Sequence, residues 1–146
     1  MMKKFLYIML SVFLLTQVNA LEKTKEEKVA KYILENMQKD YTSCYGFYKI
    51  ASEIFKKTDV ENSIVEGLEA SSDITLKFAH DLGEVLNYKP EIMTENNKKE
   101  IKRLNVIAKK DLNRLTKKYG VMCKKLVENQ KQRIDYWENE GNKKIK

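Results

Sequence analysis

Apolar residues recur at helical spacing along three long stretches of the chain. With each residue taken as a 100° step, the apolar positions of residues 25–57 keep to one face, as do those of 59–86 and 94–140. Thr24 and Glu27 form a capping box before the first stretch, Asp59 is a good N-cap for the second, and Thr94 caps the third. The pattern predicts an all-α protein, an up-down-up three-helix bundle with long first and third helices.

Each predicted helix has its own buried stripe. The first stripe runs without interruption through the polar patch 40–43, whereas the second includes the hydroxyl residues Ser71 and Thr75 and is the weakest. Residues 87–93 contain the single proline, Pro90, and are predicted to be a loop, while the helical pattern stops at 141–142. The expected stripes are Val29, Ile33, Met37, Tyr41, Cys44, Phe47, Tyr48, Ala51, Ile54 and Phe55; then Val60, Ile64, Leu68, Ser71, Thr75, Phe78, Leu82 and Val85 or Leu86; then Ile101, Leu104, Ala108, Leu112, Leu115, Tyr119, Met122, Leu126 and Trp137.

The amino-terminal residues do not belong to these three helical stripes, and their pattern is that of an export signal. Lys3 and Lys4 precede an apolar run from Phe5 to Leu15, and 18–20 provides small residues where signal peptidase cleaves. An uncleaved anchor is the alternative, but an apolar run of eleven residues falls short of the roughly 20 needed to cross a bilayer. We therefore expect a signal peptide over 1–20, one helical domain over 21–140 and a basic tail over 141–146, in the periplasm or secreted.

The chain has two cysteines, Cys44 and Cys123, which an oxidising compartment would allow to pair. Two buried free thiols are the other possibility. Three straight helices would leave Cys44 level with Lys110, about 20 Å from Cys123 at a rise of about 1.5 Å per residue. A disulfide requires Cα atoms within about 7 Å. Pairing therefore predicts a descending loop around Pro90, or a bend at 71–73 or Gly120.

Charge is distributed unevenly over the predicted helices. Nine acidic residues and two lysines lie between Asp59 and Glu95, whereas thirteen basic and three acidic residues lie between Lys98 and Arg133. Such faces usually serve only to solvate a helix, but a cationic face could also bind an anionic partner. The candidate cationic face consists of Lys99, Arg103, Lys110, Arg114, Lys117, Lys124 and Lys131, and the opposing acidic face of Glu66, Glu69, Asp73 and Glu84.

The sequence offers little that could support catalysis or hold a cofactor. His80 is the single histidine, and with Asp73 and Glu84 it forms a very incomplete metal-ligand set, so a solvated histidine is the simpler interpretation. No serine has a histidine at helical spacing, and no CxxC, CxxCH or glycine-rich phosphate loop occurs. We therefore expect no enzyme activity, no cofactor and no metal.

The remaining features favour a binding protein. The leading hypothesis is an exported interaction module, such as an inhibitor, immunity-like protein or adaptor, with Trp137 as a candidate partner anchor. The second is an electrostatic binder of anionic envelope material through the cationic face, and the third an unconventional enzyme around His80. Nucleic acid is not an expected partner, because the cationic face has no interleaved aromatic residues for stacking. The mature chain is expected to have no membrane span.

Overall fold

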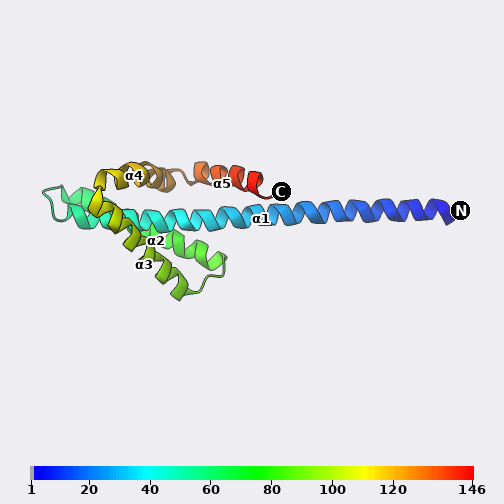
Figure 1. The fold of residues 1–146 in the computed structure, drawn as a ribbon, viewed down its shortest axis with the longest axis horizontal. Helices are drawn as coiled ribbons and strands as arrows, with labels where there is room; N and C mark the ends of the chain where they lie inside the picture. Colours follow the sequence, from blue (N-terminus) through cyan, green and yellow to red (C-terminus); the bar gives the residue numbers. More distant parts are fainter. Residues whose placement is uncertain (1) are drawn as a thin grey trace.

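The protein is built from five helices and is not the predicted three-helix bundle. The computed structural model describes residues 2–146, with side chains from Thr24 onward, so the predicted signal peptide and its cleavage site lie outside the described side chains. In this part of the chain every regular element is helical (Figure 1). The helices are α1 (Met2–Phe55), α2 (Asn62–Val85), α3 (Pro90–Lys110), α4 (Leu112–Glu128) and α5 (Gln130–Lys144).

Helix α1 is the axis on which the other four helices pack. Helices α4 and α5 follow one side of α1, and α2 and α3 lie on the other (Figure 1). As a result, the middle of α1 is buried almost all the way around, and its polar Gln38, Thr42 and Ser52 are as buried as its apolar Tyr41 and Cys44. A helix of a simple bundle buries only one face, whereas α1 is a central helix and is buried on most of its sides.

The predicted third helix is in fact three helices. The breaks fall at Asp111, whose backbone is extended with φ −162° and ψ 95°, and at Asn129, with φ −148° and ψ 76°. The side chain of Asp111 accepts a hydrogen bond from the backbone N–H of Arg114 and so caps α4. Asp favours such a cap over a helix interior because its side chain satisfies a free backbone N–H, whereas Asn129 precedes α5 without a side-chain capping bond. Neither helix breaks at the expected bend positions 71–73 and Gly120, because α2 and α4 run through them.

The predicted loop 87–93 is shorter than expected. Helix α3 begins at Pro90, with Lys89 as its N-cap rather than Thr94. Proline suits this position because its fixed φ fits the first turn and its missing N–H would be unpaired there in any case. Asn87 makes the turn with a positive φ of 58°, a conformation that asparagine tolerates better than most residues. At the other end of the chain, α5 continues past the predicted stop at 141–142 to Lys144.

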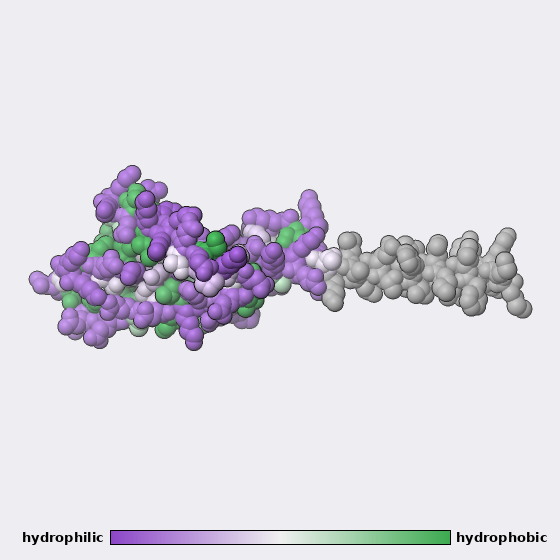
Figure 2. All heavy atoms as spheres, turned by 90° about the horizontal axis from the view of Figure 1, so that it is seen from below, coloured by the Kyte–Doolittle hydropathy of each residue, from purple (hydrophilic) through white to green (hydrophobic). Residues whose placement is uncertain are grey.

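Helix α2 buries a side that only partly agrees with the predicted stripe. Three residues of its expected stripe, Ile64, Phe78 and Val85, are 48%, 39% and 63% exposed. Thr75 is fully buried as predicted, and Leu68 and Leu82 pack against the core, but the other buried residues are Val65, Ser72, Ala79 and Gly83. These mostly small side chains allow α2 to approach α1 closely, and a close approach buries more of α1 than a bulky stripe would. Viewed from the α2–α3 side, the surface is mainly hydrophilic with separate apolar patches (Figure 2).

The predicted disulfide is confirmed, although the expected route to it is wrong. Cys44 on α1 and Cys123 on α4 are bonded, with their Cα atoms 5.3 Å apart. The chain reverses at Asp111, so that α3 runs in the same direction as α1 and α4 runs against it (Figure 1). This reversal places Cys123 beside Cys44 without a descending loop or a bend in α4. Both cysteines are fully buried.

Candidate functional site

A polar cleft of about 550 Å³ lies where α1 faces α3. From α1 it is lined by Gln38, Lys39, Thr42 and Ser43, and from α3 and the turn before it by Tyr88, Ile92, Asn96, Lys99, Glu100 and Arg103. Residues four apart lie on the same face of a helix, so the lining residues recur at this spacing along the two walls formed by α1 and α3. The cleft therefore presents a row of amide, hydroxyl and charged groups.

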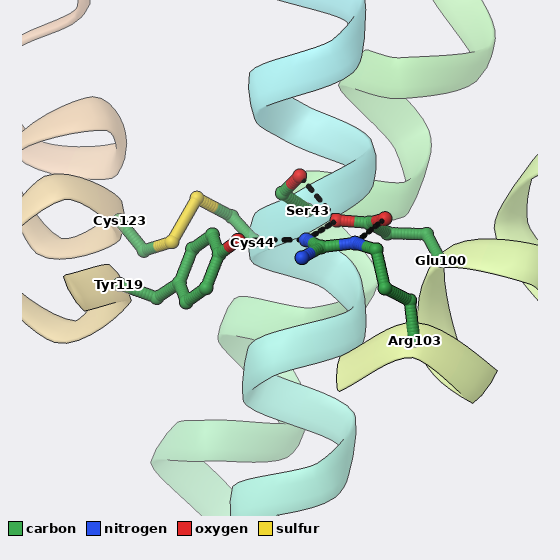
Figure 3. Close-up of polar contacts among 6 residues, drawn as sticks. All are labelled: Ser43, Cys44, Glu100, Arg103, Tyr119 and Cys123. Atoms are coloured by element: carbon green, nitrogen blue, oxygen red, sulfur yellow. Dashed lines mark hydrogen bonds and ion pairs between the residues drawn. A yellow bond between two sulfur atoms is a disulfide. The ribbon is translucent and has the colours of Figure 1, made fainter. Parts of the chain in front are cut away.

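One wall of the cleft is a connected set of hydrogen bonds that joins three helices (Figure 3). The hydroxyl of Ser43 donates to Glu100 over 2.6 Å, and Arg103 donates to the same carboxylate through Nε at 2.7 Å and Nη2 at 2.6 Å. Nη2 of Arg103 also donates to the hydroxyl of Tyr119 on α4 over 2.6 Å. The Cys44–Cys123 bond lies next to this network (Figure 3). Its geometry is consequently held by α1, α3 and α4 together.

The network fixes the charge of its members. Burial acts to raise the pKa of Glu100, but the hydrogen bonds from Arg103 and Ser43 outweigh it, so the pKa of this carboxyl lies below its ordinary value. The hydrogen bond to Glu100 raises the pKa of Arg103. Glu100 is therefore ionised and fully engaged near neutral pH, which is the opposite of what a general acid or base requires.

A second surface feature, here called the α4–α5 groove, lies over the junction of α4 and α5. It has a volume of about 490 Å³. Exposed apolar groups stand in it, with Val121 64% and Tyr136 46% exposed. Basic and amide side chains surround them: the lining residues are Lys118, Val121, Met122, Lys125, Leu126, Asn129, Gln132, Arg133 and Tyr136. The groove combines apolar contact area with positive charge.

Trp137, the candidate anchor, is tied into the protein directly behind this groove. Its indole N–H donates to Asp40 over 2.6 Å, and Arg133 donates to the two oxygens of the same carboxylate over 2.7 and 3.1 Å. The guanidinium of Arg133 lies 4.6 Å from the ring centre of Tyr136 and 4.7 Å from that of Trp137. Trp137 is partly buried, whereas its neighbour Tyr136 is the more exposed aromatic residue. The structure thus brings Trp137 to the groove as a support for its wall.

The candidate cationic face is divided among three helices. Lys99, Arg103 and Lys110 belong to α3, Arg114, Lys117 and Lys124 to α4, and Lys131 to α5. Four of the seven make ion pairs with neighbours on their own helix, namely Lys99, Arg103, Lys124 and Lys131. Among the described residues, Lys110, Arg114 and Lys117 form no side-chain ion pair and gather where α3 meets α4. These three residues of the candidate cationic face are here called the basic corner.

The acidic face and His80 give no sign of a metal site. Glu66, Asp73 and Glu84 are exposed on α2, Glu69 pairs with Lys56, and His80 is half-buried. In residues 24–146 no group of three or more His, Cys, Asp or Glu side chains is placed to hold a metal ion. Over the same residues, none of the helices is both long and apolar enough to cross a membrane.

Sequence reasoning missed the polar groups buried along α1. Gln38, Asp40, Thr42 and Ser43 lie between the apolar positions of the first stripe, and each makes a side-chain hydrogen bond in the structure. A cluster of polar residues within a continuous helical phase was the available signal, because buried polar groups need partners. Their partners on α3 and α5 could not be read from spacing. Comparison with protein-family models, curated proteins and solved structures finds no match for this chain.

Proposed function

We propose that this protein is an exported, non-catalytic interaction module that binds an acidic partner protein through the α4–α5 groove. The observation that carries the proposal is the exposure of Val121 and Tyr136, 64% and 46%, within a groove bordered by Lys118, Lys125 and Arg133. Protein interfaces typically combine an apolar centre with a polar rim, and their strongest contacts are enriched in Tyr, Trp and Arg. The three cations of the rim favour acidic side chains on the partner.

The groove is supported from behind, which favours binding. Arg133 is held by two hydrogen bonds to Asp40 and by the flanking rings of Tyr136 and Trp137. Helix α4 is joined covalently to α1 through Cys123. Side chains that are already ordered lose less conformational entropy when a partner binds, so more of the contact energy appears as affinity.

Export is part of the proposal for two reasons. The amino-terminal residues have the pattern of a signal peptide. The disulfide is the kind of bond that persists in an oxidising compartment such as the periplasm and is rare in a reducing one. The proposed module therefore meets its partner outside the cytoplasm.

The experiment is a quantitative capture of partners by the purified protein from an extract of the source cells. Val121→Asp puts a negative charge in the groove, and Val106→Asp makes the same change at a 51% exposed valine on α3. We expect an acidic protein that is captured by the wild type and by Val106→Asp, and at least about tenfold less by Val121→Asp. Tyr136→Ala should weaken capture by about tenfold, equivalent to about 1.4 kcal/mol. Equal capture by all four proteins would rule out the groove.

A second candidate function is supported by the basic corner. Lys110, Arg114 and Lys117 are exposed and have no ion-pair partner among the described residues, so they could bind an anionic envelope polymer. Salt separates the two functions, because exposed charges are screened over about 10 Å at 0.1 M ionic strength. Binding at the basic corner should fall steeply with salt, whereas binding at the partly apolar groove should fall less.

A further inference from the structure

We infer that the cleft between α1 and α3 is a binding site for a small, hydroxyl-rich carboxylic acid of the sugar-acid type. The cleft lies on other helices than the α4–α5 groove, and the inference does not depend on the function proposed for that groove. Its volume of about 550 Å³ falls within the range of about 300–1,000 Å³ typical of small-molecule sites. Its position beside the α1–α3–α4 network gives it one rigid wall.

Hydroxyl groups fit the uncharged part of the lining. Gln38 and Asn96 are amides, and Thr42 and Tyr88 carry hydroxyls. Each of these groups can both donate and accept a hydrogen bond, which is also true of every hydroxyl of a sugar. Gln38 and Thr42 are only 5% and 6% exposed and are oriented by the hydrogen bond between them. They form a polar wall whose geometry is set before a ligand enters.

A negative charge on the ligand follows from the charges at the cleft. Lys39, Lys99 and Arg103 face a single acidic residue there, Glu100. Glu100 already accepts three hydrogen bonds, two from Arg103 and one from Ser43, so its charge is satisfied. Lys39 forms no ion pair among the described side chains, and Lys99 pairs with Glu95 on the exposed side of α3. An exposed pair of this kind is weak, so a carboxylate can compete for Lys99.

The apolar side chains of the lining, Tyr88 and Ile92, lie at one end of the cleft. Tyr88 and Ile92 border the cleft where the chain turns from α2 into α3, and Ile92 is 46% exposed. A ring of moderate size could pack its apolar face there while its hydroxyls reach the amides of the wall. A fully apolar ligand would leave Gln38 and Thr42 without hydrogen bonds to it, which disfavours that class.

The experiment titrates the folded protein with three probes of the same size, namely glucuronate, glucose and glucosamine, by calorimetry and by backbone amide chemical shifts. We expect glucuronate to bind at least about tenfold more tightly than either of the other two, because it alone carries a negative charge. The shifts should be confined to residues 38–43 and 88–103. Galacturonate and gluconate are titrated as well, so that the result does not depend on one ring geometry.

Two lysine variants locate the site. Lys39→Gln and Lys99→Gln should each weaken glucuronate binding by about five- to tenfold, whereas Lys102→Gln, an exposed lysine on α3 outside the cleft lining, should change it less than about twofold. The inference is overturned if none of the three sugar acids binds below about 20 mM, equivalent to only about 2 kcal/mol of affinity. It is also overturned if glucose and glucosamine bind as well as glucuronate, or if the three lysine variants behave alike.

Discussion

Asp40 and Arg133, which are 93 residues apart in the chain, form a two-point ion pair between α1 and α5. Asp40 is only 8% exposed, yet its carboxylate accepts hydrogen bonds from Nε and Nη2 of Arg133 and from the indole N–H of Trp137. A buried charge is tolerated only where such partners surround it. This contact holds α5 on α1 together with the edge-to-face packing of Trp137 on Tyr32.

Replacing Asp40 with alanine should destabilise the protein by about 3 kcal/mol. The change leaves the largely buried Arg133 charge and the Trp137 N–H without their acceptor, and breaking a buried ion pair on one side carries a cost of this size. Urea unfolding followed by circular dichroism measures the effect. Asp135→Ala, which breaks the exposed Lys131–Asp135 pair on the same helix, is the control and should cost less than about 0.5 kcal/mol. Similar losses in both variants would contradict the structural role of Asp40.

Replacing both Cys44 and Cys123 with alanine should destabilise the protein by about 4 kcal/mol. The bond closes a loop between residues 79 apart, and loops of this length restrict the unfolded chain by about that free energy. The urea midpoint of the double variant, compared with that of the oxidised wild type, gives the value. Reduced wild-type protein should unfold at the same urea concentration as the double variant. An unchanged midpoint would mean that the bond does not stabilise the fold.

Two glycines of α2 should respond to alanine in opposite directions. A Cβ at Gly67 would have no neighbour within 4 Å, whereas one at Gly83 would collide with the Sδ of Met93 and lie 3.2 Å from its Cγ. Gly67→Ala should therefore stabilise the protein by about 0.5–1 kcal/mol through helix propensity. Gly83→Ala should destabilise it by about 1–3 kcal/mol, because buried Met93 must move. Thermal unfolding of the two variants tests the pair, and stabilisation by Gly83→Ala would show that α2 and Met93 pack loosely.

The ion pair of Glu100 should make stability depend on acid pH. Burial works against the charged form, but Arg103 and Ser43 lower the pKa of Glu100 overall in the folded protein. Its contribution is therefore complete above the ordinary value of 4.5 and is lost as the pH falls through 4.5 towards the lower folded pKa. Unfolding free energies of the wild type and Glu100→Gln, measured from pH 7 to pH 3, should converge over this interval. A constant difference between the two proteins would contradict the lowered pKa.

The sequence predicted those parts of the fold where large apolar residues decide the packing. The stripes of α1 and of the α3–α4 region, with Met37, Tyr41, Leu104 and Leu115, lie in the core as expected. The stripe of α2 was right for Thr75, Leu68 and Leu82 but wrong for Ile64 and Val85, because the rest of its buried side consists of Ser72, Ala79 and other small residues. A helix that packs closely needs small side chains, and these carry little hydrophobic signal in the sequence.

The helix breaks and the cleft could not be read from the pattern. Leu104, Ala108, Leu112 and Leu115 keep one phase across Asp111 although the chain reverses there, since both α3 and α4 turn their apolar sides to α1. Of the cleft residues, only Lys99 and Arg103 were singled out in the sequence, and for a different surface. Their neighbours Gln38 and Thr42 come from α1, and only the reversal at Asp111 brings α3 beside them.

The chain order of these contacts also governs when the protein can fold. Cys44, Asp40 and Ser43 lie on the first helix to be made, but their partners follow 79, 93 and 57 residues later. During synthesis α2 can pack on α1 as soon as it is made, but Asp40, Ser43 and Cys44 must wait for α3, α4 and α5. Contacts of such separation slow folding. The contacts that hold α3, α4 and α5 on the central helix can therefore close only once the last third of the chain has been made.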